Sequence, residues 1–162
     1  MIDLDKIKSF DALSRDEQVE ALTLIDKWKK LNRIAQGKCK RLMVMLPPRH
    51  TKSEFASTYF PAWMMGLNPS LKIIQATHTA ELAVRFGRRV RNIIDSEEYQ
   101  TIFPDINLSG DNKSAGRWTT DDGGEAFYSG VGGAITGRGA DLLIIDDPHS
   151  EQDAMSPTAM DA

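Results

Sequence analysis

The chain has 162 residues, of which 41% are hydrophobic and 27% charged, and its formal net charge is −3. This size fits one domain with a substantial core, and the absence of any run of about 18 apolar residues predicts no membrane-spanning helix. The charged N-terminus does not resemble a secretory signal, and the single cysteine, Cys39, excludes an internal disulfide and is typical of a reducing cytoplasm. The mildly acidic balance argues against coating of nucleic acid by the whole surface, although it is compatible with a local basic groove.

The N-terminal part of the chain predicts one helix followed by one strand. Residues 13–35 carry apolar side chains at helical spacing, and Gly37 is a natural helix end. The run RLMVML at residues 41–46 has no polar alternation, as is typical of a strand buried on both faces of a sheet. We therefore divide the chain into an N-terminal helical segment, residues 1–36, and a core, residues 37–162.

Helices and apolar strands alternate through the first half of the core. A helix is expected from Lys52 to about Met65, and the run LKIIQA at residues 71–76 predicts a second strand. A long helix is predicted over residues 79–95, with Thr79 as its N-cap. This alternation favours parallel strands joined by helical crossovers.

The second half of the core is richer in turns. Residues 97–116 are predicted to be mostly loop, and RWTTDDGGEAFYSGV predicts a hairpin around Asp122. The run DLLIIDD at residues 141–147 predicts another buried strand that ends in two carboxylates. The expected fold is therefore α/β, with a mostly parallel sheet flanked by helices and the hairpin as a local antiparallel excursion.

The segment LMVMLPPRHTKSE, residues 42–54, has the order of a phosphate-binding loop: strand, short loop, then Lys52-Ser53 opening a helix. The standard pattern G-x-x-x-x-G-K-[ST] uses the lysine for phosphate and the hydroxyl for Mg²⁺. The helix dipole also favours an anion at this position. In this chain, however, Leu46 and Thr51 occupy the two glycine positions.

The chemistry of this loop also contains elements that oppose phosphate binding. Pro47 and Pro48 lack N–H donors, and the β-branched Thr51 is expected to resist a positive φ angle. The loop is therefore expected to follow a path different from that of the glycine form, with Arg49 replacing backbone donors by its guanidinium group. The alternative is an ordinary strand-to-helix turn in which Lys52 is a surface lysine.

The run LLIIDDPH supplies a second candidate motif. An acidic residue after an apolar strand is typical of a Mg²⁺ ligand, here Asp146, and Asp147 is placed to orient or deprotonate a water molecule. One alternative is a plain turn, because Asp-Asp-Pro is good turn chemistry. Another alternative joins Asp146, Asp147 and His149 into the site of a metal-dependent hydrolase.

Together, these motifs resemble the N-terminal ATPase domain of the large subunit of tailed-phage terminases, the motors that package DNA. The likeness covers roughly residues 40–150 and rests on MLPPRHTKSEFAS, FPAWMMG, EYQTIFPD, GRWTTDDGG and GVGGAITGRGADLLIIDDPHS, in that order. It implies a P-loop NTPase core of the ASCE type, with a Walker A loop, a Walker B strand, and ATP and Mg²⁺ as ligands. Thr51 departs from the Pro-Arg-His-Gly-Lys-Ser form that is common in this family.

The resemblance assigns roles to the residues that match the family's motifs. Ser53 and Asp146 would hold Mg²⁺, Asp147 would be the catalytic carboxylate, and Arg49 would act on the γ-phosphate. Arg138 is a candidate arginine finger for a neighbouring subunit, or else a structural arginine that pairs with Asp141. The implied nucleotide-binding loop comprises Pro48, Arg49, His50, Thr51, Lys52 and Ser53.

Basic residues near the second strand have two interpretations each. His78, in QATHT, is either a loop-end histidine or a group that senses nucleotide or contacts DNA. Arg85, Arg88 and Arg89 share one helix face by their spacing. That face would lie along a phosphate backbone, or it is an ordinary solvated helix surface.

The resemblance further implies partners and missing parts. The partners would be double-stranded phage DNA, the portal protein, the small terminase subunit and further copies of the chain in a ring, in the host cytoplasm at the procapsid and not at a membrane. The family's ATPase domain and nuclease domain continue beyond the point where this sequence stops, so we expect an incomplete core without DNA cleavage. The alternatives are a nucleotide- or DNA-binding fragment without turnover and a helicase-like DNA translocase outside packaging.

Overall fold

The computed structural model describes residues 14–45 and 51–149. The chain divides into two compact units, Met1–Pro47 and Pro48–Ala162, so that the boundary falls inside the predicted phosphate loop. Within the described ranges, no helix combines the length and apolar character that crossing a bilayer requires.

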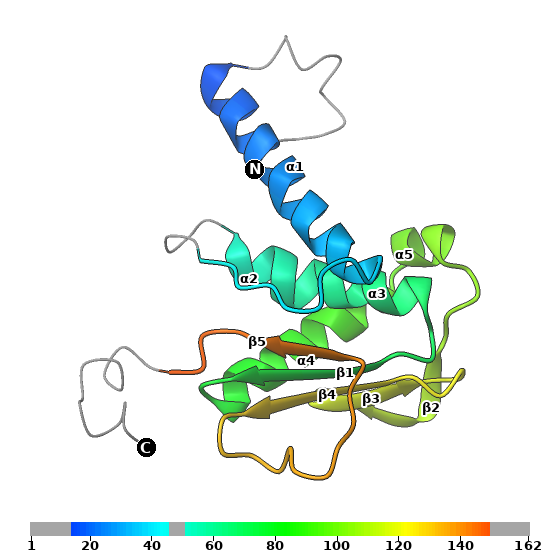
Figure 1. Cartoon of the computed structure of the whole chain (residues 1–162). Helices are drawn as coiled ribbons and strands as arrows, with labels where there is room; N and C mark the ends of the chain where they lie inside the picture. Colours follow the sequence, from blue (N-terminus) through cyan, green and yellow to red (C-terminus); the bar gives the residue numbers. More distant parts are fainter. Residues whose placement is uncertain (1–13, 46–50, 150–162) are drawn as a thin grey trace, which may run out of the picture. The chain divides into compact units, whose positions relative to one another are not determined.

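The first unit contains the long helix α1, Arg15–Ala35 (Figure 1). The helix predicted over residues 13–35 is therefore confirmed. It ends where expected, because Gly37 adopts a φ of 69°, and its N–H donates to the Ile34 carbonyl at 2.8 Å. A left-handed residue at this position closes a helix by satisfying carbonyls of its last turn.

The strand predicted over residues 41–46 is wrong for its described part. Residues 41–45 form no strand, and the side chains of Met43 and Met45 are 81% and 82% exposed. An apolar run without alternation acquires strand structure from burial on both faces of a sheet. Neither methionine is buried in this way, so the local pattern alone does not produce the strand. Leu46 lies outside the described residues.

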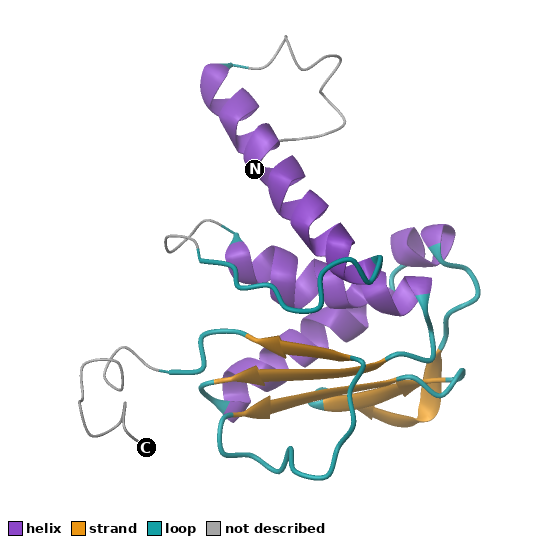
Figure 2. Cartoon of the chain, viewed as in Figure 1, coloured by secondary structure: helices purple, strands orange, loops and turns teal. Residues whose placement is uncertain are grey.

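The second unit combines helices with one sheet (Figures 1 and 2). A continuous helical segment opens it, as predicted from Lys52, and includes a π-helical stretch in the middle. In chain order the elements are α2 (Lys52–Glu54), the π-helix η3 (Phe55–Tyr59), α3 (Phe60–Leu67), β1 (Lys72–Thr77), α4 (Ala80–Ile94), α5 (Glu97–Ile102), β2 (Leu108–Ser114), β3 (Arg117–Thr120), β4 (Glu125–Gly130) and β5 (Leu142–Ile145).

The sheet of the second unit is mixed, with the strand order β2-β3-β4-β1-β5 in the described part of the chain. Strand β1 pairs in parallel with β4 on one side and with β5 on the other, whereas β3 pairs antiparallel with β2 and β4. The predicted α/β class is confirmed, but the prediction of a mostly parallel sheet is wrong, because β3 pairs antiparallel with both of its neighbours and only the pairings of β1 are parallel among the described strands. The predicted hairpin β3–β4 is also present, but it is no local excursion, because β4 is an inner strand of the sheet.

Two elements of the second unit were not predicted, since residues 97–116 were expected to be mostly loop. Helix α5 is short and is capped by Ser96, whose hydroxyl accepts from the Tyr99 N–H at 3.3 Å. The Tyr99 hydroxyl also donates to the Ala62 carbonyl at 2.7 Å and so connects α5 to α3. Strand β2 has the polar sequence LSGDNKS and is stabilised by pairing with β3, which its own pattern does not indicate.

Helix α4 packs against β4 and β1 and forms the core with them. The predicted cap is present, because the Thr79 hydroxyl accepts from the Leu82 N–H at 3.2 Å. A Cβ atom at Gly87 would lie within 2.7 Å of the Tyr128 ring, so the helix approaches the sheet this closely only with glycine there. Trp118 is fully buried and donates its indole N–H to the Gly87 carbonyl at 3.2 Å.

Candidate functional site

Charged residues from two distant parts of the chain meet at one edge of the sheet. Strands β1 and β5 are parallel and end at the same edge, and Asp146 and Asp147 follow β5 directly. Lys52, the first residue of α2, places its Nζ atom 2.5 Å from Asp147 Oδ1 and 3.7 Å from Asp146 Oδ1. The carboxyl edge of parallel strands is where open α/β sheets bind ligands.

Asp146 is held in place by a residue that sequence reasoning did not single out. Its side chain is only 7% exposed, and Oδ2 accepts from the Ser57 hydroxyl at 2.8 Å. Ser57 is fully buried in the π-helical stretch η3. Such stretches are frequent at functional sites. The sequence carried no signal for this contact, because the turn of helix that faces Asp146 depends on the packing of the helix.

Two residues of the site have left-handed backbone conformations. Thr51 adopts φ 57° and ψ 16°, and Asp147 adopts φ 45°. The expectation that Thr51 would avoid a positive φ is therefore wrong. An L-residue in this region costs about 1–2 kcal/mol. Strained residues of this kind cluster at functional sites, and here both adjoin the ion pair between Lys52 and Asp147.

The two carboxylates change the acidity of Lys52. The hydrogen bond and charge of Asp147 raise the pKa of the Lys52 ammonium above its ordinary value of 10.5, with a further contribution from the Asp146 charge; partial burial acts in the opposite direction. Lys52 is therefore a full positive charge at neutral pH. The three side chains together present one cation between two anions, of which Asp147 is the more exposed.

The raised pKa predicts a pH-dependent contribution of Lys52 to folding stability. Below the unfolded pKa of 10.5 the ion pair stabilises the fold, by no more than about 1 kcal/mol for a pair with one exposed partner. The contribution is lost as the pH rises through the higher folded pKa. The urea midpoints of the native chain and Lys52→Met should therefore differ at about pH 8. They should converge only as the pH rises beyond 10.5, through the raised folded pKa of Lys52. A difference that stays constant across this range would contradict the assignment.

Ser57→Ala is predicted to destabilise the fold, because it leaves Oδ2 of the buried Asp146 without its donor. The expected loss is about 1–3 kcal/mol. Ser53→Ala is a matched control on the same helical segment; Ser53 is partly exposed and should change stability by less than about 0.5 kcal/mol. Urea unfolding of both variants measures the difference, and equal stabilities would show that the Ser57 hydroxyl does not support Asp146.

Only some of the other residues predicted for the phosphate loop lie in the described part of the chain. Ser53 lies on α2 beside Lys52, whereas Pro48, Arg49 and His50 lie outside the described residues. Among the described residues, no three or more His, Cys, Asp or Glu side chains gather closely enough to hold a metal ion on their own. The alternative of a metal-dependent hydrolase site that includes His149 therefore lacks the cluster it requires.

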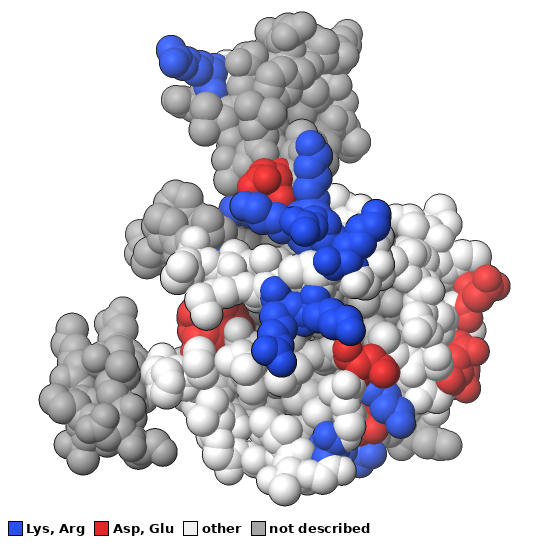
Figure 3. All heavy atoms as spheres, viewed as in Figure 1, with Lys and Arg blue, Asp and Glu red and all other residues white. Residues whose placement is uncertain are grey.

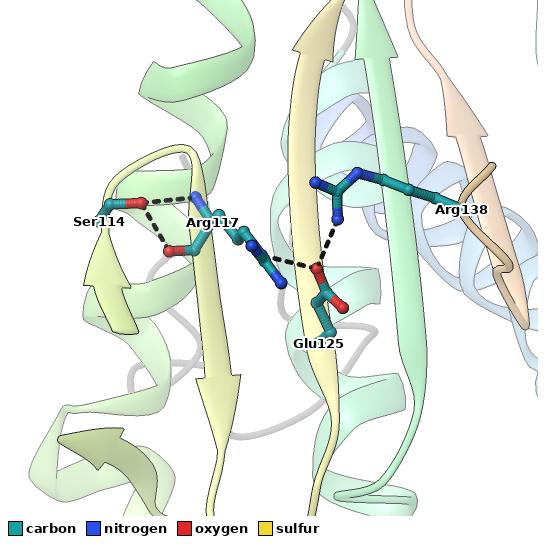
Figure 4. A network of polar contacts seen from close by, with 4 residues as sticks. All are labelled: Ser114, Arg117, Glu125 and Arg138. Carbon is teal, nitrogen blue, oxygen red and sulfur yellow. Dashed lines mark hydrogen bonds and ion pairs between the residues drawn. The ribbon is translucent and has the colours of Figure 1, made fainter. Parts of the chain in front are cut away.

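Arg138 reaches toward Glu125, the first residue of β4 (Figure 4), whereas Asp146 and Asp147 follow the last residue of β5. Its Nη1 atom is 3.0 Å from Glu125 Oε1, and its guanidinium group lies 4.0 Å from the centre of the Phe127 ring. Glu125 Oε1 also accepts from Arg117 Nε at 2.8 Å. Arg138 thus has a structural partner, but that partner is not Asp141, whose side chain accepts from the Lys72 N–H at 2.9 Å.

The fold and the site define an α/β protein with a lysine and two aspartates converging at the carboxyl edge of two parallel strands. Comparisons with protein-family models, with curated proteins and with solved structures find no match to this chain. The function therefore has to be inferred from the site itself and from the motifs that form it.

Proposed function

We propose that this chain is the ATP-binding and ATP-hydrolysing motor domain of a phage terminase large subunit, with a P-loop NTPase core that depends on Mg²⁺. The convergence of Lys52 with Asp146 and Asp147 at the carboxyl edge of β1 and β5 carries this proposal. If Lys52 and the two aspartates belonged only to ordinary turns, there would be no reason for these two distant segments to come together. The left-handed Thr51, at the position of the motif's second glycine, supports it independently.

In this mechanism Lys52 exchanges partners when ATP binds. A triphosphate carries more negative charge than one carboxylate and competes with Asp147 for the ammonium group. Asp147 is then released to orient or deprotonate the attacking water. The carboxylate is well placed for this exchange, because its side chain is 64% exposed while Asp146 remains buried.

The donor set at this edge fits Mg²⁺, which prefers oxygen ligands and usually takes one or two carboxylates together with substrate phosphates. Asp146 would hold the ion, with a hydroxyl from Ser53 as predicted or from Ser57, which already contacts that carboxylate. Bound Mg²⁺ would neutralise charge on the phosphate groups. Ser57 would keep the Asp146 carboxylate oriented, and Lys52 would hold the phosphate.

The wider role follows from the resemblance of the motifs. ATP hydrolysis would drive double-stranded DNA through the portal protein, with several copies of the chain in a ring and the small terminase subunit delivering the DNA. These partners place the protein in the host cytoplasm at the procapsid. Arg138 would act as an arginine finger only if it left Glu125, which Arg117 would still neutralise.

The proposal is tested by titrating the purified chain with a fluorescent ATP analogue and Mg²⁺ while phosphate release is recorded. Lys52→Ala is expected to weaken binding at least about tenfold, because it removes a charge-assisted contact of about 1.5–3 kcal/mol. Lys72→Ala is the matched control. Lys72 is an exposed lysine of the same unit at the other end of β1, and its replacement should leave binding unchanged.

The outcomes separate the candidate functions. Binding that depends on Lys52, together with phosphate release, supports the ATPase. Binding without release supports a nucleotide-binding fragment without turnover. If the folded native chain does not bind the analogue, or if Lys52→Ala and Lys72→Ala behave alike, the proposed phosphate site is wrong.

A further inference from the structure

The helical segment that begins at Lys52 contains one turn that is wider than an α-helical turn. The π-helical stretch η3 lies between α2 and α3, and in it the Phe60 N–H donates to the Phe55 carbonyl, five residues earlier. A turn of this kind holds one more residue than an α-helical turn. Each residue of an α-helix turns the chain by about 100°. The extra residue therefore changes the direction in which α2 presents its side chains relative to α3.

The wide turn has a cause in the sequence, because Pro61 is the second residue of α3. In a regular α-helix a proline has no N–H to donate, and its ring clashes with the carbonyl four residues earlier, here that of Ser57. An extra residue in the turn before the proline relieves this clash. The helix after the turn is fixed, since Pro61 is fully buried and the Ala62 carbonyl accepts from the Tyr99 hydroxyl at 2.7 Å.

The wide turn pairs one of two neighbouring hydroxyl groups and leaves the other unpaired. Ser57 donates to Asp146 Oδ2 at 2.8 Å. Thr58 is 1% exposed, and its Oγ1 atom has no hydrogen-bond partner within the described part of the chain. In a regular helix a threonine hydroxyl donates to the carbonyl four residues earlier, which here belongs to Glu54. A buried hydroxyl without a partner is unfavourable, so local hydrogen bonding alone does not favour the wide turn.

The same turn affects the direction of Lys52. The side chains of Lys52 and Ser57 both reach Asp146, although the two residues are five positions apart. Residues at this spacing lie about 140° apart around a regular α-helix, and an extra residue in the turn between them reduces that angle. None of the residues of α2 is buried, so α2 is the part that would rotate if the turn became regular.

Surface contacts do little to hold α2 in its present direction. Glu54 pairs with Arg89 of α4, with Oε2 3.0 Å from Nη1, and both side chains are partly exposed. Figure 3 shows that charged side chains on the face in view form several separate groups of opposite sign. Exposed ion pairs contribute little to stability. The direction of α2 is therefore determined mainly within the helix.

We propose that Pro61 is a positioning residue of the candidate site. Its ring keeps the extra residue in the turn, and this arrangement, the π register, directs Lys52 and Ser57 toward the carboxylates that follow β5. The inference rests on the proposed function, since Lys52 is the group that would hold phosphate. Without the proline the turn becomes α-helical, and α2 rotates by about 100° relative to α3.

Urea unfolding without nucleotide tests the register. Thr58→Val should not raise the unfolding equilibrium constant of the native chain, because the hydroxyl that it removes has no partner. In Pro61→Ala, where Thr58 would donate to the Glu54 carbonyl, the same substitution should raise that constant about fivefold, the effect of one hydrogen bond. Pro104→Ala is the matched control. Pro104 is an exposed turn residue after α5, and its replacement should leave the effect of Thr58→Val unchanged.

Titration with the fluorescent ATP analogue and Mg²⁺ tests the position of Lys52. Pro61→Ala is expected to weaken binding at least about tenfold, as predicted for Lys52→Ala, whereas Pro104→Ala should bind like the native chain. Addition of Lys52→Ala to Pro61→Ala should cause no further loss, because the ammonium group has already been turned away. The unfolding constant of Pro61→Ala should stay within about tenfold of the native value, since the gain in helix propensity offsets the lost ring contacts.

Two results would overturn the proposal. Equal effects of Thr58→Val in the native chain and in Pro61→Ala would show that the proline does not set the register. Analogue binding by Pro61→Ala at the native affinity would show that the proline does not position Lys52. If the native chain itself does not bind the analogue, the ATPase proposal fails, and the unfolding measurements still decide whether Pro61 sets the register.

Discussion

Asp147→Asn is expected to lower ATP turnover by about 10²–10⁴-fold, the usual contribution of a positioned general base. Asparagine has nearly the same shape as aspartate but cannot take a proton from water at neutral pH. It also tolerates the left-handed backbone, so the φ of 45° at this position should be retained. The substitution therefore tests the charge of the side chain with little effect on the path of the backbone.

The measurement is single-turnover hydrolysis of labelled ATP at saturating Mg²⁺, with binding of the fluorescent analogue measured on the same sample. Binding should persist, because Lys52 no longer pairs with a charged residue 147 and remains available to phosphate, while its contact with Asp146 is retained. Stability should change by no more than about 1 kcal/mol, as expected for a pair with an exposed partner. Asp122→Asn, in the exposed turn between β3 and β4, is the matched control. Turnover equal to that of the native chain would remove Asp147 from the mechanism.

Trp118→Ala is expected to cause the largest loss of folding stability, about 3–5 kcal/mol. The side chain is fully buried, packs against Tyr128 with ring centres 6.4 Å apart, and donates to the Gly87 carbonyl. Its removal would leave a cavity beneath the part of α4 where the helix lies closest to the sheet. A loss of this size is a large fraction of the about 5–15 kcal/mol that stabilises a typical domain.

Urea unfolding followed by far-UV circular dichroism would measure this loss. Trp118→Phe should lose less, because it keeps much of the apolar contact, although it gives up the indole N–H and part of the ring volume. Ile102→Ala is a control for apolar truncation on the surface, since Ile102 is 68% exposed and should change stability by about 0.5 kcal/mol or less. If Trp118→Ala were as mild as this control, the packing described for α4 would be incorrect.

The parts of the fold that were predicted from sequence are those whose signals are local. Helix α4 has a periodic apolar pattern and a threonine cap, and β1 and β5 are short apolar runs between turn residues. The prediction that β5 is buried is wrong, however, because β5 is an edge strand of the described sheet and Leu143 and Ile145 are 58% and 60% exposed. The polar strand β2 was missed because its partner β3, and not its own sequence, makes it a strand. Residues 41–45 were mispredicted for the converse reason, since an apolar run becomes a strand only where a sheet buries it.

In the candidate site, too, some residues were predicted from the sequence and others depend on tertiary packing. The meeting of Lys52 with Asp146 and Asp147 was expected, because the ends of parallel strands share one edge of a sheet. Ser57 was not expected, since its contact depends on how a π-helical stretch turns toward Asp146. The Glu125 partner of Arg138 was also missed, because it is set by the path of a loop across the sheet and not by sequence proximity.

The order of strands in the sheet has a consequence for synthesis of the chain. Strand β1 lies between β4 and β5, and both of these strands follow it in the sequence. The partner of Lys52, Asp147, is likewise 95 positions further along the chain. At about 5–20 residues per second, a ribosome needs about 5–20 s to synthesise the segment between these two residues. For part of this interval both hydrogen-bonding edges of the apolar β1 are open, because β4 begins only at Glu125 and β5 only at Leu142. An apolar strand whose edges stay unpaired is a template for pairing with other chains, so slower elongation would increase the exposure of the nascent chain to aggregation.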